Sequence, residues 1–280
     1  MSKIGIVGWG VVGRAIGEGF RCAHKVLWHD PYKDGSTLLD KLVAKSEFIF
    51  ICVPTPMFED FLGIDLGVVD EVVGQIAPRV EGTDKIVIIK STVLPGTTAS
   101  FVKKYPKVNV ASNPEFLIEK TAKEDFLNPD RTVVGAQRDI ALRVKKIYEA
   151  FLPEDHKYFL TDPTTAELVK YASNVTLASR IGVANEIYQI AQALGVDYGV
   201  VRKMVGADWR IGTAMTQVPG PDGDFGFGGK CLPKDMVAFL ELEKRLGVDM
   251  SVIRAIWEKN LKVRNVRDWE RIPGAVSKKW

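Results

Sequence analysis

Short, uniformly apolar segments alternate with amphipathic segments over the first half of the chain. Strands buried on both faces of a parallel sheet have this uniform character, whereas amphipathic helices repeat their apolar positions every three to four residues. The alternation therefore predicts an α/β fold, with a doubly wound parallel sheet of the Rossmann type in the N-terminal half. The expected strands are 3–8, 25–30, 47–53, 85–93, 107–116 and 131–136, and the expected helices are one that ends at about Cys22 and one over 68–78.

The second half of the chain has a helical pattern throughout. From Thr164 to Leu194 there is no proline and the helical periodicity persists, which predicts one long helix or two helices in series. Apolar positions surround much of this segment, so it must be covered on more than one side. Further helices are expected near 196–206, 233–246 and 249–268, and the tail from Arg271 is expected to fray. We expect a Rossmann domain over 1–162 and an all-helical domain with a long central helix over 163–280.

The first expected strand leads into GWGVVG, in which Gly8, Gly10 and Gly13 have the spacing of a dinucleotide-binding turn. Gly8 permits the tight turn, Gly10 lets the backbone approach a pyrophosphate, and Gly13 lets the helix pack on the strand. Asp30 ends the second strand, where a carboxylate can accept hydrogen bonds from ribose hydroxyls and would repel a 2′-phosphate. We therefore expect NAD rather than NADP; the alternative is a glycine-rich turn without function.

Polar residues follow three of the expected strands, in VPTP at 53–56, KST at 90–92 and SNPE at 112–115. Ligands in open α/β sheets bind outside the carboxyl ends of the strands, so these segments should line one crevice. The alternative is that serine and threonine simply end the strands. The candidate residues are Thr55, Ser91, Thr92 and Glu115.

The segment GFGGKCLPKD at 226–235 places Cys231 in a glycine-dense loop before an expected helix. The positive end of a helix dipole favours the thiolate, and Lys230 and Lys234 add positive charge, which indicates an activated nucleophile. The alternative is a glycine-rich loop with a bystander thiol. Lys170 and Asn174 are four residues apart and thus neighbours on one helix face, as a functional pair or as a solvated one.

Composition excludes several classes of protein. With a net charge of +3 and no dense basic block, the sequence suggests neither nucleic acid nor a membrane surface as partner. The longest apolar run, Phe48 to Val53, is too short to span a bilayer, and the N-terminus enters a strand pattern without a signal peptide. Three cysteines without CxxC spacing and three scattered histidines predict no disulfide framework and no metal site. We expect a cytoplasmic protein.

Taken together, these motifs resemble those of the UDP-glucose/GDP-mannose dehydrogenase family over essentially the whole chain. GFGGKCLPKD is the most specific match. Members of that family usually carry a third domain that grips the nucleotide, and no strand pattern for it follows the last expected helix, so we expect the nucleotide to be held differently here. The supporting matches are GWGVVG, CVPTP (52–56), KSTVLPGTT (90–98), SNPEFLIEK (112–120), AELVKYASN (166–174) and WRIG (209–212).

The resemblance implies an NAD-dependent, four-electron oxidation of a nucleotide sugar, with UDP-glucose converted to UDP-glucuronate as the expected reaction. Cys231 would form a thiohemiacetal with the aldehyde intermediate and then a thioester. Lys170 and Asn174 would hold the reacting oxygen, and Glu115 would be the general base for thioester hydrolysis. Asp235 would position Lys170 or the water, and Thr92 would order that water. The product would feed polysaccharide biosynthesis.

The resemblance also implies binding residues and a homodimer built on the long central helix, across which Arg210 would reach the substrate of the partner subunit. NAD would be held by Gly8, Trp9, Gly10, Val11, Val12, Gly13, Asp30, Lys33, Val53, Pro54, Thr55, Pro56, Ser91, Thr92, Glu119 and Lys234. The substrate would be held by Glu115, Phe116, Leu117, Lys170, Asn174, Arg210, Phe225, Gly226, Phe227 and Gly228.

Two other functions are compatible with the same sequence features. One is a two-electron 3-hydroxyacid dehydrogenase, whose relatives share the Rossmann start and a similar lysine and asparagine pair but lack the cysteine loop. The other is an NAD-binding remnant without catalytic activity. The number of NADH molecules formed per substrate distinguishes these functions: two for the four-electron oxidation, one for the two-electron oxidation and none for the remnant.

Overall fold

The N-terminal half forms a seven-stranded sheet in the order β2-β1-β3-β4-β5-β6-β7, which confirms the expected α/β fold. The structure is a computed structural model and describes residues 1–277. The strands are β1 (Lys3–Val7), β2 (Lys25–His29), β3 (Phe48–Ile51), β4 (Ile86–Ile89), β5 (Asn109–Ser112), β6 (Thr132–Gly135) and β7 (Tyr158–Thr161).

The pairing of the central strands places the expected polar segments next to one another. Strands β1 to β5 are parallel, and Ile51, Ile89 and Ser112 are partners at the carboxyl ends of β3, β4 and β5. Contrary to the expectation of a wholly parallel sheet, β6 pairs with β5 in the antiparallel direction. The sequence pattern also missed β7, which is an edge strand of half-buried and exposed residues and so lacks the apolar run of a central strand.

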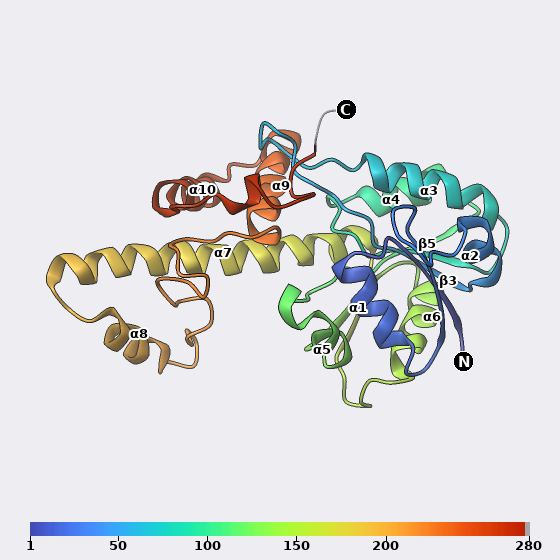
Figure 1. The fold of residues 1–280 in the computed structure, drawn as a ribbon, viewed down its shortest axis with the longest axis horizontal. Coiled ribbons are helices and arrows are strands. Elements are labelled where there is room, and N and C mark those ends of the chain that lie inside the picture. Colours follow the sequence, from blue (N-terminus) through green and yellow to red (C-terminus); the bar gives the residue numbers. More distant parts are fainter. Residues whose placement is uncertain (278–280) are drawn as a thin grey trace. The chain divides into compact units, whose positions relative to one another are not determined.

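Helices cover both faces of the sheet (Figure 1). Along β1, Ile4 and Ile6 point to one face and Val7 to the other, because successive side chains of a strand alternate. The two faces therefore bury separate apolar cores, which fix the strand ends that carry the candidate site. One face packs against α1 (Val11–Phe20), α5 (Ala122–Leu127) and α6 (Arg138–Glu149), and the other against α2 (Leu39–Lys45), α3 (Gly67–Val80) and α4 (Thr97–Lys104).

The chain divides into two compact units, one of residues 1–55 and 66–170, the other of residues 56–65 and the chain from 171 on. The boundary expected between 162 and 163 lies at the start of α7, whereas the contacts divide the chain within that helix. Of the two alternatives for this segment, the structure has one continuous helix of 32 residues. The helices of the second half are α7 (Pro163–Leu194), α8 (Tyr198–Gly206), α9 (Cys231–Leu246) and α10 (Ser251–Val263).

The C-terminal tail is ordered as far as the structure describes it. Val276 pairs with Met57, and Met57 N–H donates to the Ala275 carbonyl over 2.9 Å. Trp269, in the short helix η2 (Asp268–Glu270), is buried. The expectation of fraying from Arg271 is therefore wrong for 271–277, and its remainder, 278–280, lies outside the described residues. Within residues 1–277, none of the helices has both the length and the apolar character needed to cross a bilayer.

Candidate functional site

The glycine turn after β1 has the geometry that a bound pyrophosphate requires. Gly8 has a φ of +91°, and a Cβ there would lie 2.6 Å from the Cys52 carbonyl oxygen. A Cβ at Gly13 would collide with the carbonyl of Gly8, so α1 can pack this closely only with glycine at that position. Gly10 is the N-cap of α1 and faces open space. The N–H groups at this helix end can therefore bind phosphate oxygens.

Asp30 is fixed beside this turn. Its Oδ2 accepts the Trp9 backbone N–H over 2.9 Å, and its Oδ1 accepts the Tyr32 N–H over 3.1 Å. Each carboxylate oxygen keeps a lone pair for a ribose hydroxyl. The Trp9 ring stacks on Trp28 with 4.9 Å between centroids, which holds the turn against β2. These residues fit the adenosine half of NAD. The other expected NAD contacts nearby are exposed or half-buried: Val11, Val12 and Lys33.

The polar segments after β3 and β4 are tied together. Ser91 Oγ donates to the Val53 carbonyl over 2.7 Å, and the Ser91 N–H donates to the Ile51 carbonyl over 3.0 Å. Thr55 is buried and Thr92 is half-buried. Ser91 therefore holds the loop that Thr92 belongs to. The remaining expected contacts here are Pro54, which is exposed, Pro56, which is half-buried, and Glu119, which is exposed at the start of the short helix η1 (Glu119–Thr121).

Glu115 and Lys170, which are far apart in sequence, form a buried ion pair with 3.0 Å between Lys170 Nζ and Glu115 Oε1. The other carboxylate oxygen of Glu115 accepts the Leu117 N–H over 2.7 Å. Burial raises the pKa of Glu115, but the Lys170 ammonium, the Leu117 N–H and Lys90 together lower it by more, so the pKa lies below its ordinary value. Lys170 Nζ also lies 5.6 Å from the centroid of the Phe116 ring. Glu115 is thus an ionised base held next to a cation.

Glu167, one turn before Lys170 on α7, anchors this part of the helix. Its two carboxylate oxygens accept the N–H groups of Gly96 and Thr98 over 2.7 and 2.8 Å, at the start of α4. Burial raises the pKa of Glu167 to about 7, against these hydrogen bonds. Glu167 thus ties α7, which carries Lys170, to the start of α4, which follows the loop after Thr92.

Asn174 and Asp235 form a second buried group. Asn174 Nδ2 donates to Asp235 Oδ2 over 2.5 Å, and Lys234 Nζ lies 2.5 Å from Asp235 Oδ1. Asp235 thus orients the Asn174 amide and forms an ion pair with the Lys234 ammonium. The expected role of Asp235 toward Lys170 stays a prediction.

Cys231 is the first residue of α9 and is exposed. The helix begins two residues earlier than expected, since Pro233 fits in a first turn, where a backbone N–H needs no helical partner. The thiol therefore lies at the positive end of the α9 dipole, in the same turn as Lys234.

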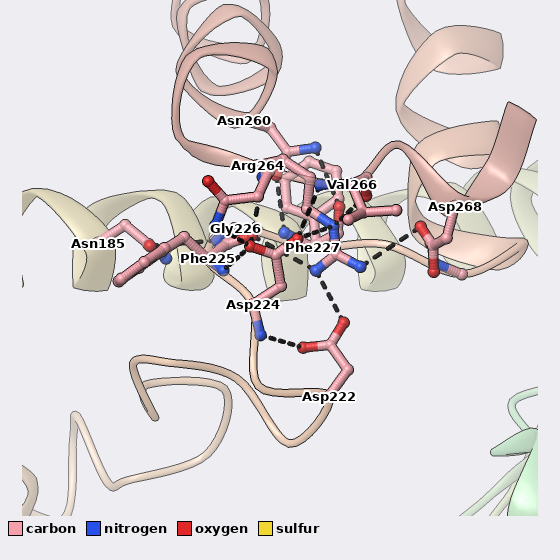
Figure 2. Close-up of polar contacts among 12 residues, drawn as sticks. Asn185, Asp222, Asp224, Phe225, Gly226, Phe227, Asn260, Arg264, Val266 and Asp268 are labelled. Carbon is pink, nitrogen blue, oxygen red and sulfur yellow. Dashed lines mark hydrogen bonds and ion pairs between the residues drawn. The ribbon is translucent and has the colours of Figure 1, made fainter.

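Side chains of α7 and α10 hydrogen-bond to the backbone of the glycine-rich loop before Cys231 (Figure 2). Phe227 N–H donates to Asn260 Oδ1 over 2.7 Å, Asn260 Nδ2 donates back to the Phe227 carbonyl over 3.0 Å, and Gly226 N–H donates to Asn185 Oδ1 over 3.1 Å. A Cβ at Gly228 would collide with the guanidinium of Arg264. The backbone N–H groups of Gly226 and Phe227 therefore already donate hydrogen bonds to side chains of the protein.

Arg264 forms ion pairs with three acidic residues in and near this loop. Its buried guanidinium pairs with Asp222 over 2.7 Å, and with Asp224 and Asp268 over 3.4 Å each (Figure 2). Sequence reasoning singled out neither Arg264 nor Asn260, because nothing local to either residue indicates its partners. The other expected substrate residues of this unit are Phe225, which is half-buried, and Arg210, which is exposed and pairs with Asp208 over 2.6 Å.

Comparisons with known proteins agree on one family. Residues 32–152 match the NAD binding domain of the UDP-glucose/GDP-mannose dehydrogenase family, and residues 164–262 match its central domain. UDP-glucose 6-dehydrogenase of Rickettsia felis is 37% identical over 223 residues, which is 78% of this chain and 48% of that protein. The chain therefore spans about half the length of the curated relatives it matches. NAD is the cofactor that its N-terminal unit is built to bind.

Solved structures give the same result. A UDP-glucose dehydrogenase from Pyrobaculum islandicum superimposes with a TM-score of 0.83 at 34% identity, over 94% of this chain and 68% of that one. The 3-hydroxyisobutyrate dehydrogenase of Mycobacterium tuberculosis superimposes over 94% of this chain and 93% of its own, with a TM-score of 0.74 but only 15% identity. The second likeness shows the fold alone.

Proposed function

Because the chain belongs to the UDP-glucose/GDP-mannose dehydrogenase family, we propose that it catalyses the NAD-dependent oxidation of a nucleotide sugar to an acid, with UDP-glucose as substrate. The observation that carries this proposal is the exposed Cys231 at the N-terminus of α9. A two-electron alcohol oxidation needs no nucleophile, whereas oxidation of an aldehyde to an acid is facilitated by a thiol that binds the aldehyde covalently.

In the first half of the proposed reaction, the primary alcohol of the sugar loses a hydride from carbon and its hydroxyl proton, which passes to water, and becomes an aldehyde. NAD, when bound, would supply the hydride acceptor for each oxidation. The Lys170 ammonium stabilises the oxygen as negative charge develops on it, and the amide of Asn174, oriented by Asp235, donates to the same oxygen.

In the second half, the Cys231 thiolate adds to the aldehyde carbon and gives a thiohemiacetal, whose oxidation gives a thioester. Water then attacks the thioester carbonyl and passes its proton to the Glu115 carboxylate, and the carbon–sulfur bond breaks with its electron pair returning to sulfur. The lowered pKa of Glu115 means that this base is ready in its ionised form at neutral pH.

A panel of candidate substrates tests the proposed function. We expect NAD reduction with UDP-glucose, and weaker or no reduction with GDP-mannose, UDP-N-acetylhexosamines and 3-hydroxyisobutyrate. Reduction with 3-hydroxyisobutyrate alone would contradict the proposal and favour the two-electron alternative. Binding of NAD without reduction by any member of the panel would favour the remnant. The cytoplasmic location and the link to polysaccharide biosynthesis stay predictions.

We also propose that the protein is a homodimer through α7 and α8. Apolar side chains are exposed near the end of α7, where Ile190 is 58% and Leu194 71% exposed, and they continue onto α8 with Met204. A helix with apolar residues on this much of its surface needs a covering partner.

Sedimentation tests the dimer. We expect the wild-type protein to sediment as a dimer and the double variant Ile190→Glu/Leu194→Glu as a monomer, because two charges would be buried without partners. The control is Phe159→Glu, which puts one such charge at an exposed apolar position on β7 and should leave the dimer intact. A wild-type monomer at micromolar concentration would contradict the proposed interface.

A further inference from the structure

Lys90, the residue directly after β4, is a buried lysine outside the set of expected catalytic residues. It is 5% exposed, and its Nζ donates to Asn113 Oδ1 over 3.0 Å and to the Pro114 carbonyl over 3.3 Å. Lysine is almost never buried without a partner. Both of its partners directly precede Glu115, so Lys90 holds the segment that presents this carboxylate.

Asn113 is fixed from several elements at once. Besides the bond from Lys90, its Oδ1 accepts the Tyr148 hydroxyl of α6 over 2.5 Å, and its Nδ2 donates to the Val133 carbonyl of β6 over 2.7 Å. The Asn113 N–H donates to the Ile89 carbonyl of β4 over 2.9 Å. Both acceptor positions of Oδ1 and one N–H of Nδ2 are therefore engaged, and the path of the chain toward Glu115 is set by Lys90 and Tyr148 together.

The charges near Glu115 come mainly from two lysines. Burial raises the pKa of the Cys52 thiol to about 12 and that of Tyr148 well above its ordinary value, so both are neutral at pH 7. Burial lowers the pKa of Lys90 to about 8, although the Glu115 carboxylate raises it. Lys90 is thus mostly charged at pH 7. Lys90 and Glu115 both line a pocket of about 220 Å³, whose other charged lining residues are Asp125, Asp130 and Arg131.

We propose that Lys90 is a positioning residue for Glu115: it holds the segment before this carboxylate and, while protonated, supplies a positive charge near it. Lys170 is expected to turn to the oxygen of the substrate during the reaction, and its attraction for Glu115 then weakens. Lys90 is bound to the protein on two acceptors and keeps its place. The carboxylate therefore stays ionised and in position to take the proton of the hydrolytic water. The consequence for catalysis rests on the proposed function, whereas the electrostatic part does not.

The electrostatic part is tested without substrate, by ¹³C NMR titration of the full chain labelled at the glutamate carboxyl carbons. The Glu115 signal is assigned with Glu115→Gln. In Lys90→Met, the pKa of Glu115 should rise, because one of two neighbouring cations is removed. The matched control is Tyr148→Phe, which removes one donor to the same Asn113 oxygen and leaves the charge. It should leave the pKa of Glu115 unchanged.

The wild-type protein provides a measurement that needs no variant. The Glu115 signal should show a second, smaller step near pH 8, when Lys90 loses its proton. If Lys90→Met does not fold, this step tests whether the charge of Lys90 acts on Glu115. Its absence, an unchanged pKa in Lys90→Met, or equal pKa shifts in Lys90→Met and Tyr148→Phe would overturn the proposal.

The catalytic part is read from the pH dependence of acid formation from UDP-glucose. In Lys90→Met, the acid limb of the profile should move to higher pH, and kcat at a pH on that limb should fall about tenfold, with unchanged KM for NAD. Tyr148→Phe should keep the wild-type acid limb. A wild-type limb in Lys90→Met would overturn the role of Lys90 in catalysis. If the wild-type protein oxidises no nucleotide sugar, the proposed function fails, and the NMR titration still decides the pairing of Lys90 with Glu115.

Discussion

Replacing Cys231 by serine should lower the rate of acid formation from UDP-glucose by a factor on the order of a thousand or more. A hydroxyl remains protonated at neutral pH even at a helix N-terminus, so it is a far weaker nucleophile than a thiolate. NADH release is followed by absorbance and the acid by mass spectrometry. The variant should bind NAD with unchanged affinity, because the glycine turn and Asp30 belong to the other compact unit.

The chain offers a matched control for this substitution. Cys22 is also exposed but follows the end of α1, and Cys22→Ser should retain wild-type activity. Acid formation by Cys231→Ser at a rate near wild type would remove this residue from the mechanism.

Replacing Lys170 by alanine should lower kcat by roughly 10²- to 10³-fold, as expected for the loss of a group that stabilises charge in the transition state. The affinity for NAD should change little, and it can be followed by the fluorescence of Trp9 and Trp28, which stack beside the glycine turn. The same substitution removes the ion-pair partner of Glu115, so the pKa of this carboxyl should rise and the acid limb of the pH profile should move to higher pH.

Lys203→Ala, on the exposed surface of α8, is the control for loss of a lysine without loss of this pair. A decrease in NAD affinity at unchanged kcat in Lys170→Ala would instead give Lys170 a role in cofactor binding.

The parts of the site that depend on local pattern were predictable from the sequence. The apolar strands and the spacing of Gly8, Gly10 and Gly13 predicted the turn before α1. The polar segments after β3, β4 and β5 were placed at one edge because those strands are parallel and in register. In each case the signal lies within a few residues, and the physics is that of a single strand or helix end.

The parts that depend on partners distant in sequence were not predictable in the same way. Lys90 and Arg264 carry charges, and charged residues are mostly exposed, so nothing local indicates that they are buried. Their burial follows from Asn113 in one case and from Asp222 and Asp224 in the other. The ordered tail over 271–277 also depends on a distant partner, since Val276 pairs with Met57, more than two hundred residues earlier.

The number of NADH molecules formed per molecule of acid tests the central claim most directly. UDP-glucose is incubated with excess NAD until it is consumed, NADH is measured by absorbance, and UDP-glucuronate is quantified by mass spectrometry. Covalent capture of the aldehyde by Cys231 followed by hydrolysis predicts two NADH for each acid. One NADH per consumed substrate, with an aldehyde or ketone as the product, would contradict the account.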